Sequence, residues 1–271
     1  MRQVLSPVDS QFRTGEMKER FRPVILRFDS LDSTNTEAAR QALGGAQEGL
    51  CIVAREQSAG RGRQERVWIS PANAGLYCSI LLRPRLELRA WPLLTLMTGV
   101  AVHDALREVC GIETDIKWPN DIYAREAKLC GILAETVETA QGRACVVGIG
   151  INLRRSALPD TLSATATSIE ALTGSPVATE TILRALLRTF AARYEMLSGA
   201  EGASLTLAAW TARSSYAQGK RVRVSLDQEI FPGTTRGLEA DGALRVETDT
   251  GQIRLVRAGD VTTLRGMKDE G

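Results

Sequence analysis

Between residues 24 and 216, short apolar runs rich in β-branched residues alternate with longer segments whose apolar residues recur at helical spacing. The apolar runs are VILRF, LCIVA, GLYCSILL and ACVVGIGINL. The clearest helical segment spans residues 91–109 and is followed by Gly111, and a second spans residues 180–197. Because strands of this kind bury at least one face against helices, we predict an α/β (α+β) domain with a mixed sheet.

The pattern changes after Gly219 to short alternating strands, RVRVSL, ALRVET and QIRLVRAG, with a hairpin signal at Asp241-Gly242. The basic residues here alternate with valine and leucine, which is typical of the wet face of a strand. We therefore predict a small C-terminal β-barrel at residues 217–271, after a main domain at residues 24–216. Residues 1–23 are weakly patterned and too few for a winged helix, so we expect an N-terminal tail.

Composition excludes several classes of protein. The net charge of +2, from 34 basic and 32 acidic residues, provides no global basic field of the kind that nucleic-acid binders carry. No apolar run approaches the roughly 18 residues of a membrane span, and the first residues lack the apolar core of a signal peptide. The five cysteines form no CxxC pair and are predicted to be reduced thiols. We expect a cytoplasmic protein that binds neither membranes nor nucleic acid directly.

The segment GRGRQERVW, residues 60–68, is the most informative stretch. Its glycines allow a tight turn close to a ligand, and Arg61, Arg63 and Arg66 place three forked cations on one loop. We predict an anion site. Since the chain has neither a GxGxxG motif nor a Walker loop, phosphates would have to be neutralised by side chains.

A second motif, KWPNDIYAREAKLCGILAE, spans residues 117–135. Pro119 and the Asn-Asp pair predict a turn that gathers Lys117, Asn120 and Asp121 at a strand end. The next strand returns with Lys128 at its start. We predict a hairpin on which two lysines and a carboxylate meet. His103, the only histidine, lies within the predicted 91–109 helix, which argues against serine–histidine or metal–histidine chemistry.

Two further motifs have weaker signals. In VVGIGINL, Gly148 and Gly150 could leave room for a flat ligand against the sheet, and Asn152 could meet its polar end. In DSTNTEA, Thr34 and Glu37 fit a capping box, which we favour over a role of Ser33, Thr34 and Asn35 in binding a polar ligand.

Taken together, DSTN, QSAGRGR with RVW, KWPND, KLCGIL-E and GIGIN resemble the biotin protein ligase family in order and spacing, over about Phe28 to Thr173. The resemblance implies the catalytic fold shared with class II aminoacyl-tRNA synthetases and lipoate ligases, followed by an SH3-like barrel. Family members with repressor activity carry an N-terminal winged helix. This chain has no room for one, so we expect the monofunctional type.

The activity implied by the resemblance has two steps. Biotin and ATP form biotinyl-5'-AMP and release pyrophosphate, and biotin is then transferred to a lysine of the biotin carboxyl carrier protein of acetyl-CoA carboxylase or a related carboxylase. Magnesium would bridge the phosphates. The implied biotin-binding residues are Ser33, Thr34, Asn35, Gln57, Arg61, Gly62, Arg63, Lys128, Gly131 and Gly148. The implied ATP-binding residues are Arg63, Arg66, Trp68, Lys117, Asn120 and Asn152, and the implied catalytic residues are Lys128, Arg63 and Asp121.

One departure and several alternatives remain at this stage. The family usually has glycine where this chain has Glu65, and a positive φ there would cost about 1 kcal/mol. A lipoate protein ligase of the same fold is the nearest alternative. A biotin-responsive transcriptional regulator is the alternative from another class. The sequence leaves open whether the protein is a monomer or a homodimer.

Overall fold

The computed structural model describes residues 3–6, 21–226 and 228–264. The elements of the larger part are β1 (Gln3–Ser6), β2 (Val24–Leu31), α1 (Thr34–Leu43), β3 (Leu50–Gln57), β4 (Gly75–Leu82), η1 (Leu88–Ala90), α2 (Pro92–Cys110), β5 (Asp115–Lys117), β6 (Asp121–Ala124), β7 (Ala127–Thr139), β8 (Gly142–Asn152), η2 (Arg155–Ala157), η3 (Asp160–Leu162), α3 (Ile169–Thr173), α4 (Thr179–Leu197) and α5 (Gly202–Thr211). Those of the smaller part are β9 (Gln218–Ser225), β10 (Ile230–Leu238), β11 (Leu244–Thr248), β12 (Ile253–Val256) and β13 (Asp260–Thr263).

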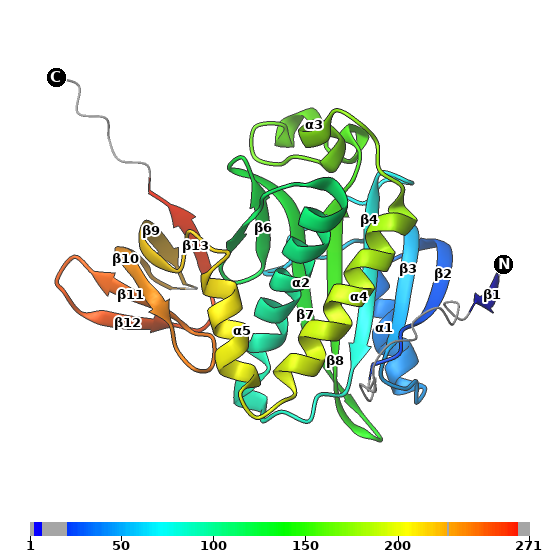
Figure 1. Cartoon of the computed structure of the whole chain (residues 1–271), viewed down its shortest axis with the longest axis horizontal. Helices are drawn as coiled ribbons and strands as arrows, with labels where there is room; N and C mark the ends of the chain where they lie inside the picture. Colours follow the sequence, from blue (N-terminus) through cyan, green and yellow to red (C-terminus); the bar gives the residue numbers. More distant parts are fainter. Residues whose placement is uncertain (1–2, 7–20, 227, 265–271) are drawn as a thin grey trace.

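Among the described residues, eight strands form one mixed sheet in the order β1-β2-β3-β4-β8-β7-β6-β5. The pair β2 and β3 is parallel, and the other neighbours are antiparallel. Helices α2 and α4 pack together over one face, whereas α1 lies behind the sheet in Figure 1. This arrangement confirms the predicted mixed sheet with helices. Strand β1 lies within the predicted tail, whose residues 1–2 and 7–20 fall outside the described part.

The strands bury residues on both faces because helices pack against both faces. Leu76, Ile80 and Leu82 of β4 belong to the large core under α2 and α4. Leu81, from the opposite face of the same strand, belongs to a small cluster with Ala38 and Ala42 of α1. The face that carries α1 is therefore only partly covered, and the rest of it is available for a cavity.

The two helices predicted from sequence are present. Pro92 occupies the first turn of α2, where its missing N–H costs nothing, and Gly111 ends the helix with a φ of 63°. Helix α4 matches the predicted 180–197 segment within one residue and buries Leu183, Leu186 and Phe190. None of the helices in the described chain is long and apolar enough to cross a membrane.

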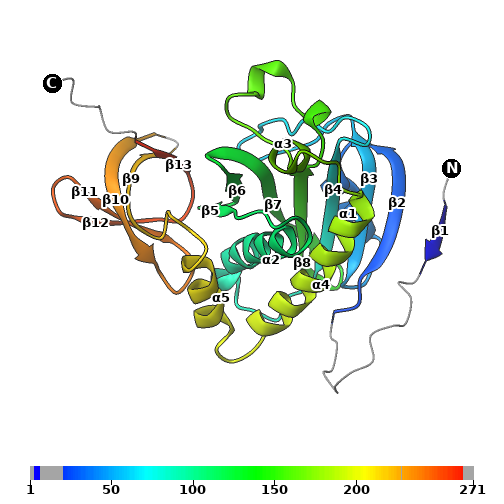
Figure 2. The same cartoon turned by 45° about the horizontal axis from the view of Figure 1, so that its top comes forward.

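The smaller part is a five-stranded antiparallel sheet in the order β12-β11-β10-β9-β13, within residues 218–264 of the described chain. It lies beside α2 and α5 in both views (Figures 1 and 2). The predicted turn at Asp241-Gly242 joins β10 to β11, and Gly242 has a φ of 84°. Residues 265–271 of the predicted C-terminal domain fall outside the described part.

Most arginines of the C-terminal part are paired with carboxylates, which agrees with the predicted wet face of strands. Five such ion pairs are Arg221–Asp249, Arg236–Glu247, Arg245–Glu239, Arg254–Glu229 and Arg257–Asp241. The charges of these five arginines are therefore balanced locally.

Candidate functional site

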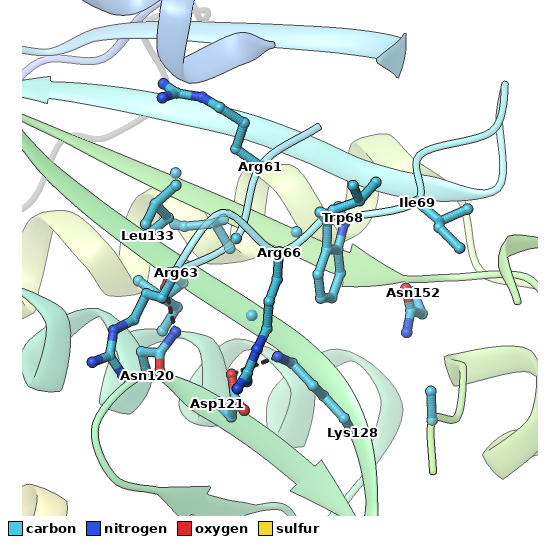
Figure 3. Close-up of a pocket in the computed structure, with 18 of the residues that line it drawn as sticks. Arg61, Arg63, Arg66, Trp68, Ile69, Asn120, Asp121, Lys128, Leu133 and Asn152 are labelled. Atoms are coloured by element: carbon cyan, nitrogen blue, oxygen red, sulfur yellow. Dashed lines mark hydrogen bonds and ion pairs between the residues drawn. The ribbon is translucent and has the colours of Figure 1, made fainter. Parts of the chain in front are cut away.

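A cavity of about 410 Å³ lies where the loop after β3, the N-terminus of α1, the hairpin β6–β7 and strand β8 meet (Figure 3). Every site residue predicted from sequence lines it. They are Ser33, Thr34, Asn35, Gln57, Arg61, Gly62, Arg63, Arg66, Trp68, Lys117, Asn120, Asp121, Lys128, Gly131, Gly148 and Asn152. Segments separated by about 120 residues thus contribute to one site.

One end of the cavity is a buried network of polar side chains. The backbone N–H and the hydroxyl of Thr34 both donate to Oε1 of Gln57, at 2.8 and 3.1 Å. Gln57 in turn donates through Nε2 to the hydroxyl of Ser70 at 2.8 Å. The hydroxyl of Ser79, which is fully buried on β4, donates to Oδ1 of Asn35 at 2.6 Å and lies 2.8 Å from the hydroxyl of Thr34. Ser79 carries no signal in the sequence, because it stands inside an otherwise apolar strand.

The predicted capping box is wrong. The N-cap of α1 is Ser33, and its side chain makes no capping hydrogen bond. Thr34 is the first helical residue, and its hydroxyl belongs to the polar network instead. The Glu37 side chain pairs with Arg40 and Gln41 on its own helix. Thr34 and Asn35 therefore face the cavity, which agrees with the less favoured interpretation, a role in binding a polar ligand.

The glycines of β8 make room for protein side chains rather than directly for a flat ligand. A Cβ on Gly148 would lie 2.2 Å from Oδ1 of Asn35, and a Cβ on Gly150 would lie 2.5 Å from the ring of Trp68. A Cβ on Gly131 of β7 would also meet that ring, at 2.9 Å. The indole of Trp68 lies against Gly150 and Gly131 of neighbouring strands, and the Asn35 amide lies against Gly148, which still lines the cavity.

The arginine loop, residues 60–68, turns through two residues with left-handed backbone. Gln64 has a φ of 53° and Glu65 a φ of 59°. The turn closes with hydrogen bonds from Gly62 N–H to Arg66 O at 2.6 Å and from Arg66 N–H to Arg63 O at 3.2 Å. Glu65 thus has the positive φ for which glycine is favoured, and the three arginines still reach the site.

The three arginines point in different directions (Figure 3). Arg66 extends toward Asp121 and Lys128 and is paired with Asp260 of the C-terminal sheet. Arg63 donates to Oδ1 of Asn120 at 3.2 Å and to the carbonyl of Gly259 at 3.3 Å, and its burial lowers the pKa of its guanidinium. Arg61 points away from these groups and pairs with Glu135 of β7 at 2.9 Å.

Two lysines lie near the centre of the site. Lys128 Nζ is 2.7 Å from Oδ1 of Asp121 and lies 5.4 Å from the centre of a Trp68 ring. This is the predicted meeting of a lysine and a carboxylate on the β6–β7 hairpin. Lys117 lies 4.9 Å from the ring centre of Tyr123 and 5.9 Å from that of Tyr216. Burial lowers the pKa of Lys117, and the nearby Asp121 partly offsets this effect.

The opposite end of the cavity is mainly apolar, with Asn152 and Thr165 as polar lining residues. Asn152 is buried and donates to the carbonyl of Thr167 at 3.1 Å. Apolar side chains surround this end, and two of them, Val67 and Leu162, are 76% and 37% exposed. Further lining residues that the sequence motifs do not single out include Val67, Ile69, Tyr123, Leu133, Leu158, Leu162, Thr165, Ala166, Asp260, Val261 and Thr262. For two of them, Val67 and Ile69, the available sequence signal was their position on either side of Trp68.

The side chains that line the cavity fit a magnesium ion whose ligands are mainly phosphate oxygens. Within the described residues, no group of three or more His, Cys, Asp or Glu side chains gathers as a metal site. The carboxylates among the lining residues are Asp121 and Asp260, and each is paired with a cation. Magnesium prefers oxygen ligands and keeps few protein contacts when phosphates are present.

The cavity therefore has three chemically distinct regions. Hydrogen-bonding side chains around Thr34 and Asn35 suit an uncharged polar ring, and the apolar end near Asn152 suits a second ring. The cations between them suit phosphates and a carboxylate. Such an arrangement can bind a carboxylic acid beside a nucleotide and stabilise negative charge that develops where they meet.

Two parts of the chain match known protein families. Residues 27–152 match the biotin/lipoate A/B protein ligase family, and residues 218–262 match the biotin protein ligase C terminal domain.

Curated relatives extend the likeness over nearly the whole chain. The chain is 35% identical to a biotin–[acetyl-CoA-carboxylase] ligase of Mycobacterium tuberculosis, with 86% of each sequence covered. It is also 35% identical to the bifunctional ligase/repressor BirA of Bacillus subtilis, with 93% of this chain and 78% of the relative covered.

A solved structure shows the same fold. The biotin protein ligase from Aquifex aeolicus in complex with biotin and ATP is similar with a TM-score of 0.77 and 28% identity. The match covers 89% of this chain and 98% of that one, which confirms the predicted fold class.

Proposed function

The chain belongs to the biotin protein ligase family, and from this premise we propose how its cavity carries out the ligase reaction. The enzyme activates biotin with ATP and transfers it to a lysine of a carboxylase carrier protein. The observation that supports the proposed site is the position of Lys128 and the arginine loop between a polar end and an apolar end of one cavity. In this assignment, residues 24–216 form the catalytic domain and residues 217–271 the C-terminal domain.

In the proposed binding mode, the ring system of biotin occupies the polar end. Ser33, Thr34, Asn35 and Gln57 hydrogen-bond its ureido group, with Gly131, Gly148 and the loop residues Arg61 and Gly62 around it. ATP occupies the other end, with Trp68 and Asn152 at the nucleoside and Arg63, Arg66, Lys117 and Asn120 at the phosphates. The indole Nε1 of Trp68 is buried without a partner among the described residues, and this supports a ligand acceptor there.

In the first step, a carboxylate oxygen of biotin attacks the α-phosphorus of ATP and pyrophosphate leaves. Negative charge increases on the α-phosphate oxygens in the transition state. The ammonium of Lys128 stabilises this charge, and its pairing with Asp121 at 2.7 Å holds it in place before the substrates bind. Arg63 and Arg66 neutralise the departing pyrophosphate.

A magnesium ion bound to the phosphates would supply further positive charge for this step, with Asp121 and Asp260 as the nearby carboxylates of the chain. The arginine loop also covers the mixed anhydride. Because water would hydrolyse that product, a loop that excludes solvent protects it.

In the second step, the neutral amine of the acceptor lysine attacks the carbonyl carbon of biotinyl-5'-AMP. An amide bond forms, and AMP leaves with the electron pair of the broken C–O bond. The attacking nitrogen must lose a proton, and Asp121 is our candidate to orient the amine and accept that proton. We also propose that the enzyme acts in the cytoplasm, consistent with the free thiols of its cysteines.

The substrate is tested by incubating the protein with ATP, Mg²⁺, a carboxylase acceptor domain and either labelled biotin or labelled lipoate. We expect the acceptor to be labelled by biotin only. Labelling by lipoate alone would favour the lipoate ligase alternative. Salt-dependent binding of the purified chain to specific DNA would instead support a regulatory role.

The central residue is tested with Lys128→Ala. Adenylate formation, measured by exchange of labelled pyrophosphate into ATP, is expected to fall about a hundred- to a thousandfold, because a preorganised charge at a developing anion contributes on this scale. Lys220→Ala is the matched control, since Lys220 lies outside the cavity on β9 and contacts Tyr216. Near wild-type exchange by the Lys128 variant would show that its role is misassigned.

A further inference from the structure

Glu135 is an acidic residue of β7 that joins the arginine loop to the polar end of the cavity. Its Oε2 atom accepts from Asn35 Nδ2 at 2.6 Å and from Arg61 at 2.9 Å. It lies on the cavity face of β7, two residues beyond Leu133, because side chains of a strand alternate between faces. The proposed chemistry uses Arg61 and Asn35 but assigns nothing to Glu135.

The hydrogen bonds of Asn35 leave its side chain only one orientation. The two hydrogens of Nδ2 go to the Glu135 carboxylate and to the carbonyl of Leu133, at 2.6 and 3.2 Å. Oδ1 accepts from the hydroxyl of Ser79 at 2.6 Å. A carboxylate and a carbonyl only accept hydrogen bonds, so a flipped amide would place oxygen against two acceptors. The nitrogen of Asn35 must therefore face β7.

This orientation determines what Asn35 can offer a ligand. Both hydrogens of its nitrogen are engaged, whereas Oδ1 has a second lone pair and receives only one hydrogen. Asn35 is buried and lines the cavity, so a ligand meets it as a hydrogen-bond acceptor. A ring N–H satisfies such an acceptor, but an acid without N–H groups leaves it unpaired, which is costly in a buried site.

We propose that Glu135 is a positioning residue that fixes Asn35 as an acceptor for a ureido N–H and so favours biotin over acids that lack this donor. The inference rests on the proposed function and deepens it. Arg61 supports the role, because its guanidinium compensates the charge of the partly buried carboxylate. The same contact ties the arginine loop to the ring-binding end.

The test compares Glu135→Met, which keeps the length of the side chain but removes the acceptor, with Glu135→Gln, which keeps a carbonyl acceptor. Glu138→Gln is the matched control, because Glu138 lies on the same strand in an exposed ion pair with Arg143. Pyrophosphate exchange gives KM for biotin and for ATP, and kcat.

We expect the methionine variant to raise KM for biotin about tenfold, as loss of a charged hydrogen bond predicts, with kcat and KM for ATP nearly unchanged. The glutamine variant is expected to raise KM for biotin by about threefold or less, and the Glu138 control not at all. An unchanged KM for biotin in the methionine variant, or a parallel loss in all three parameters, would overturn the role of Glu135.

Biotin analogues methylated at either ureido nitrogen provide a further test. If Glu135 had only a structural role, its substitution would not change how much methylation raises KM. In the wild type, methylation at one nitrogen should raise KM about tenfold or more, and in Glu135→Met it should have a much smaller effect. Equal losses in both proteins contradict the proposal. Should the methionine variant fail to fold, the same comparison is made with Glu135→Ala, which also removes the acceptor for Asn35 Nδ2.

The design separates two kinds of failure. If the wild type forms no biotin adenylate, the proposed function itself fails and this inference with it. If the wild type uses biotin normally and the Glu135 variants do as well, only the positioning role is wrong.

Discussion

At the scale of single residues, the site depends on glycines that allow other side chains to approach the sheet. Gly148 accommodates the amide of Asn35, and Gly150 accommodates the indole of Trp68. The two glycines are only two positions apart on β8, yet each admits a side chain that we assign to a different substrate. A methyl group at either position should therefore impair the binding of only one of the two substrates.

Gly148→Ala is expected to displace Asn35 and to raise KM for biotin about tenfold, with KM for ATP little changed. Gly150→Ala is expected to displace Trp68 and to raise KM for ATP by a similar factor, with KM for biotin little changed. Steady-state pyrophosphate exchange at varied biotin and varied ATP measures both constants. Each variant serves as the control for the other, and equal changes in both constants would contradict the assignment of two ends.

Sequence motifs located the residues with charge or unusual backbone freedom, and the structure brings all of them to one cavity. They did not locate Ser79 or Asp260, and Glu135 stands at the end of the second motif without an assigned role. Ser79 and Asp260 each act through a partner that is distant in the chain, and nothing in the local sequence marks them. Ser79 is an isolated hydroxyl in a buried strand, and Asp260 is one acidic residue of a short surface strand.

At the scale of elements, the arginine loop carries local strain at Glu65. A left-handed φ costs a residue with a side chain about 1 kcal/mol relative to glycine. Glu65→Gly should therefore raise the free energy of unfolding by about 1 kcal/mol, measured by urea denaturation. Glu65→Ala is the matched control, because it also removes the carboxylate but keeps the Cβ. Equal stabilities of the glycine and alanine variants would show that backbone strain at Glu65 does not contribute.

Helix α2 contains the only histidine of the chain, and its burial creates a pH dependence. Burial, with a contribution from Arg213, lowers the pKa of His103 below its ordinary value of 6.5. As the pH falls below about 6.5, the unfolded chain binds this proton while the folded chain does not, so the free energy of unfolding decreases.

We expect the wild type to lose more stability between pH 7.5 and 5.5 than His103→Gln, in denaturant titrations at both pH values. Carboxylates contribute equally to both proteins, so the difference isolates the histidine. If both proteins show the same pH dependence, the imidazole is not protected from protonation in the folded state.

Several elements could not be predicted from local pattern. Strand β10 contains Pro232, Gly233 and Gly237, which normally argue against a strand, but its pairing with β9 and β11 stabilises it. Helix α5 buries Gly202, Thr206 and Trp210 at helical spacing, and two of these lack the apolar side chains that reveal such a face. Strand β10 therefore forms because of its tertiary pairing, whereas the alanines and leucines of α5 favour a helix without revealing which face is buried.

At the scale of the whole molecule, the C-terminal sheet contacts the catalytic site at two points. The turn before β13 holds the arginine loop through the bond from Arg63 to Gly259 and the pair of Arg66 with Asp260. The hairpin between β10 and β11 accepts a hydrogen bond from Trp118 Nε1 at the carbonyl of Gly242, at 3.0 Å. The C-terminal sheet therefore helps to position residues of the proposed ATP end.

Gly242→Val tests whether this docking matters for catalysis. A Cβ at Gly242 would already lie 3.0 Å from Leu96 of α2, so a valine should push the hairpin off the catalytic domain and weaken the bond to Trp118. Since the displaced hairpin adjoins the turn that carries Lys117 and Asn120, we expect KM for ATP to rise severalfold while KM for biotin stays nearly constant.

Gly251→Val is the matched control for the docking experiment. Gly251 also has a positive φ, of 80°, in a hairpin turn of the same sheet, but a Cβ there would meet nothing within 4 Å. Both variants carry the same backbone strain, and hence a similar loss of stability in thermal unfolding, but only the Gly242 variant disturbs the contact between the domains. If the two variants changed KM for ATP equally, the effect would come from strain within the C-terminal sheet, and its docking on Trp118 would have no part in binding ATP.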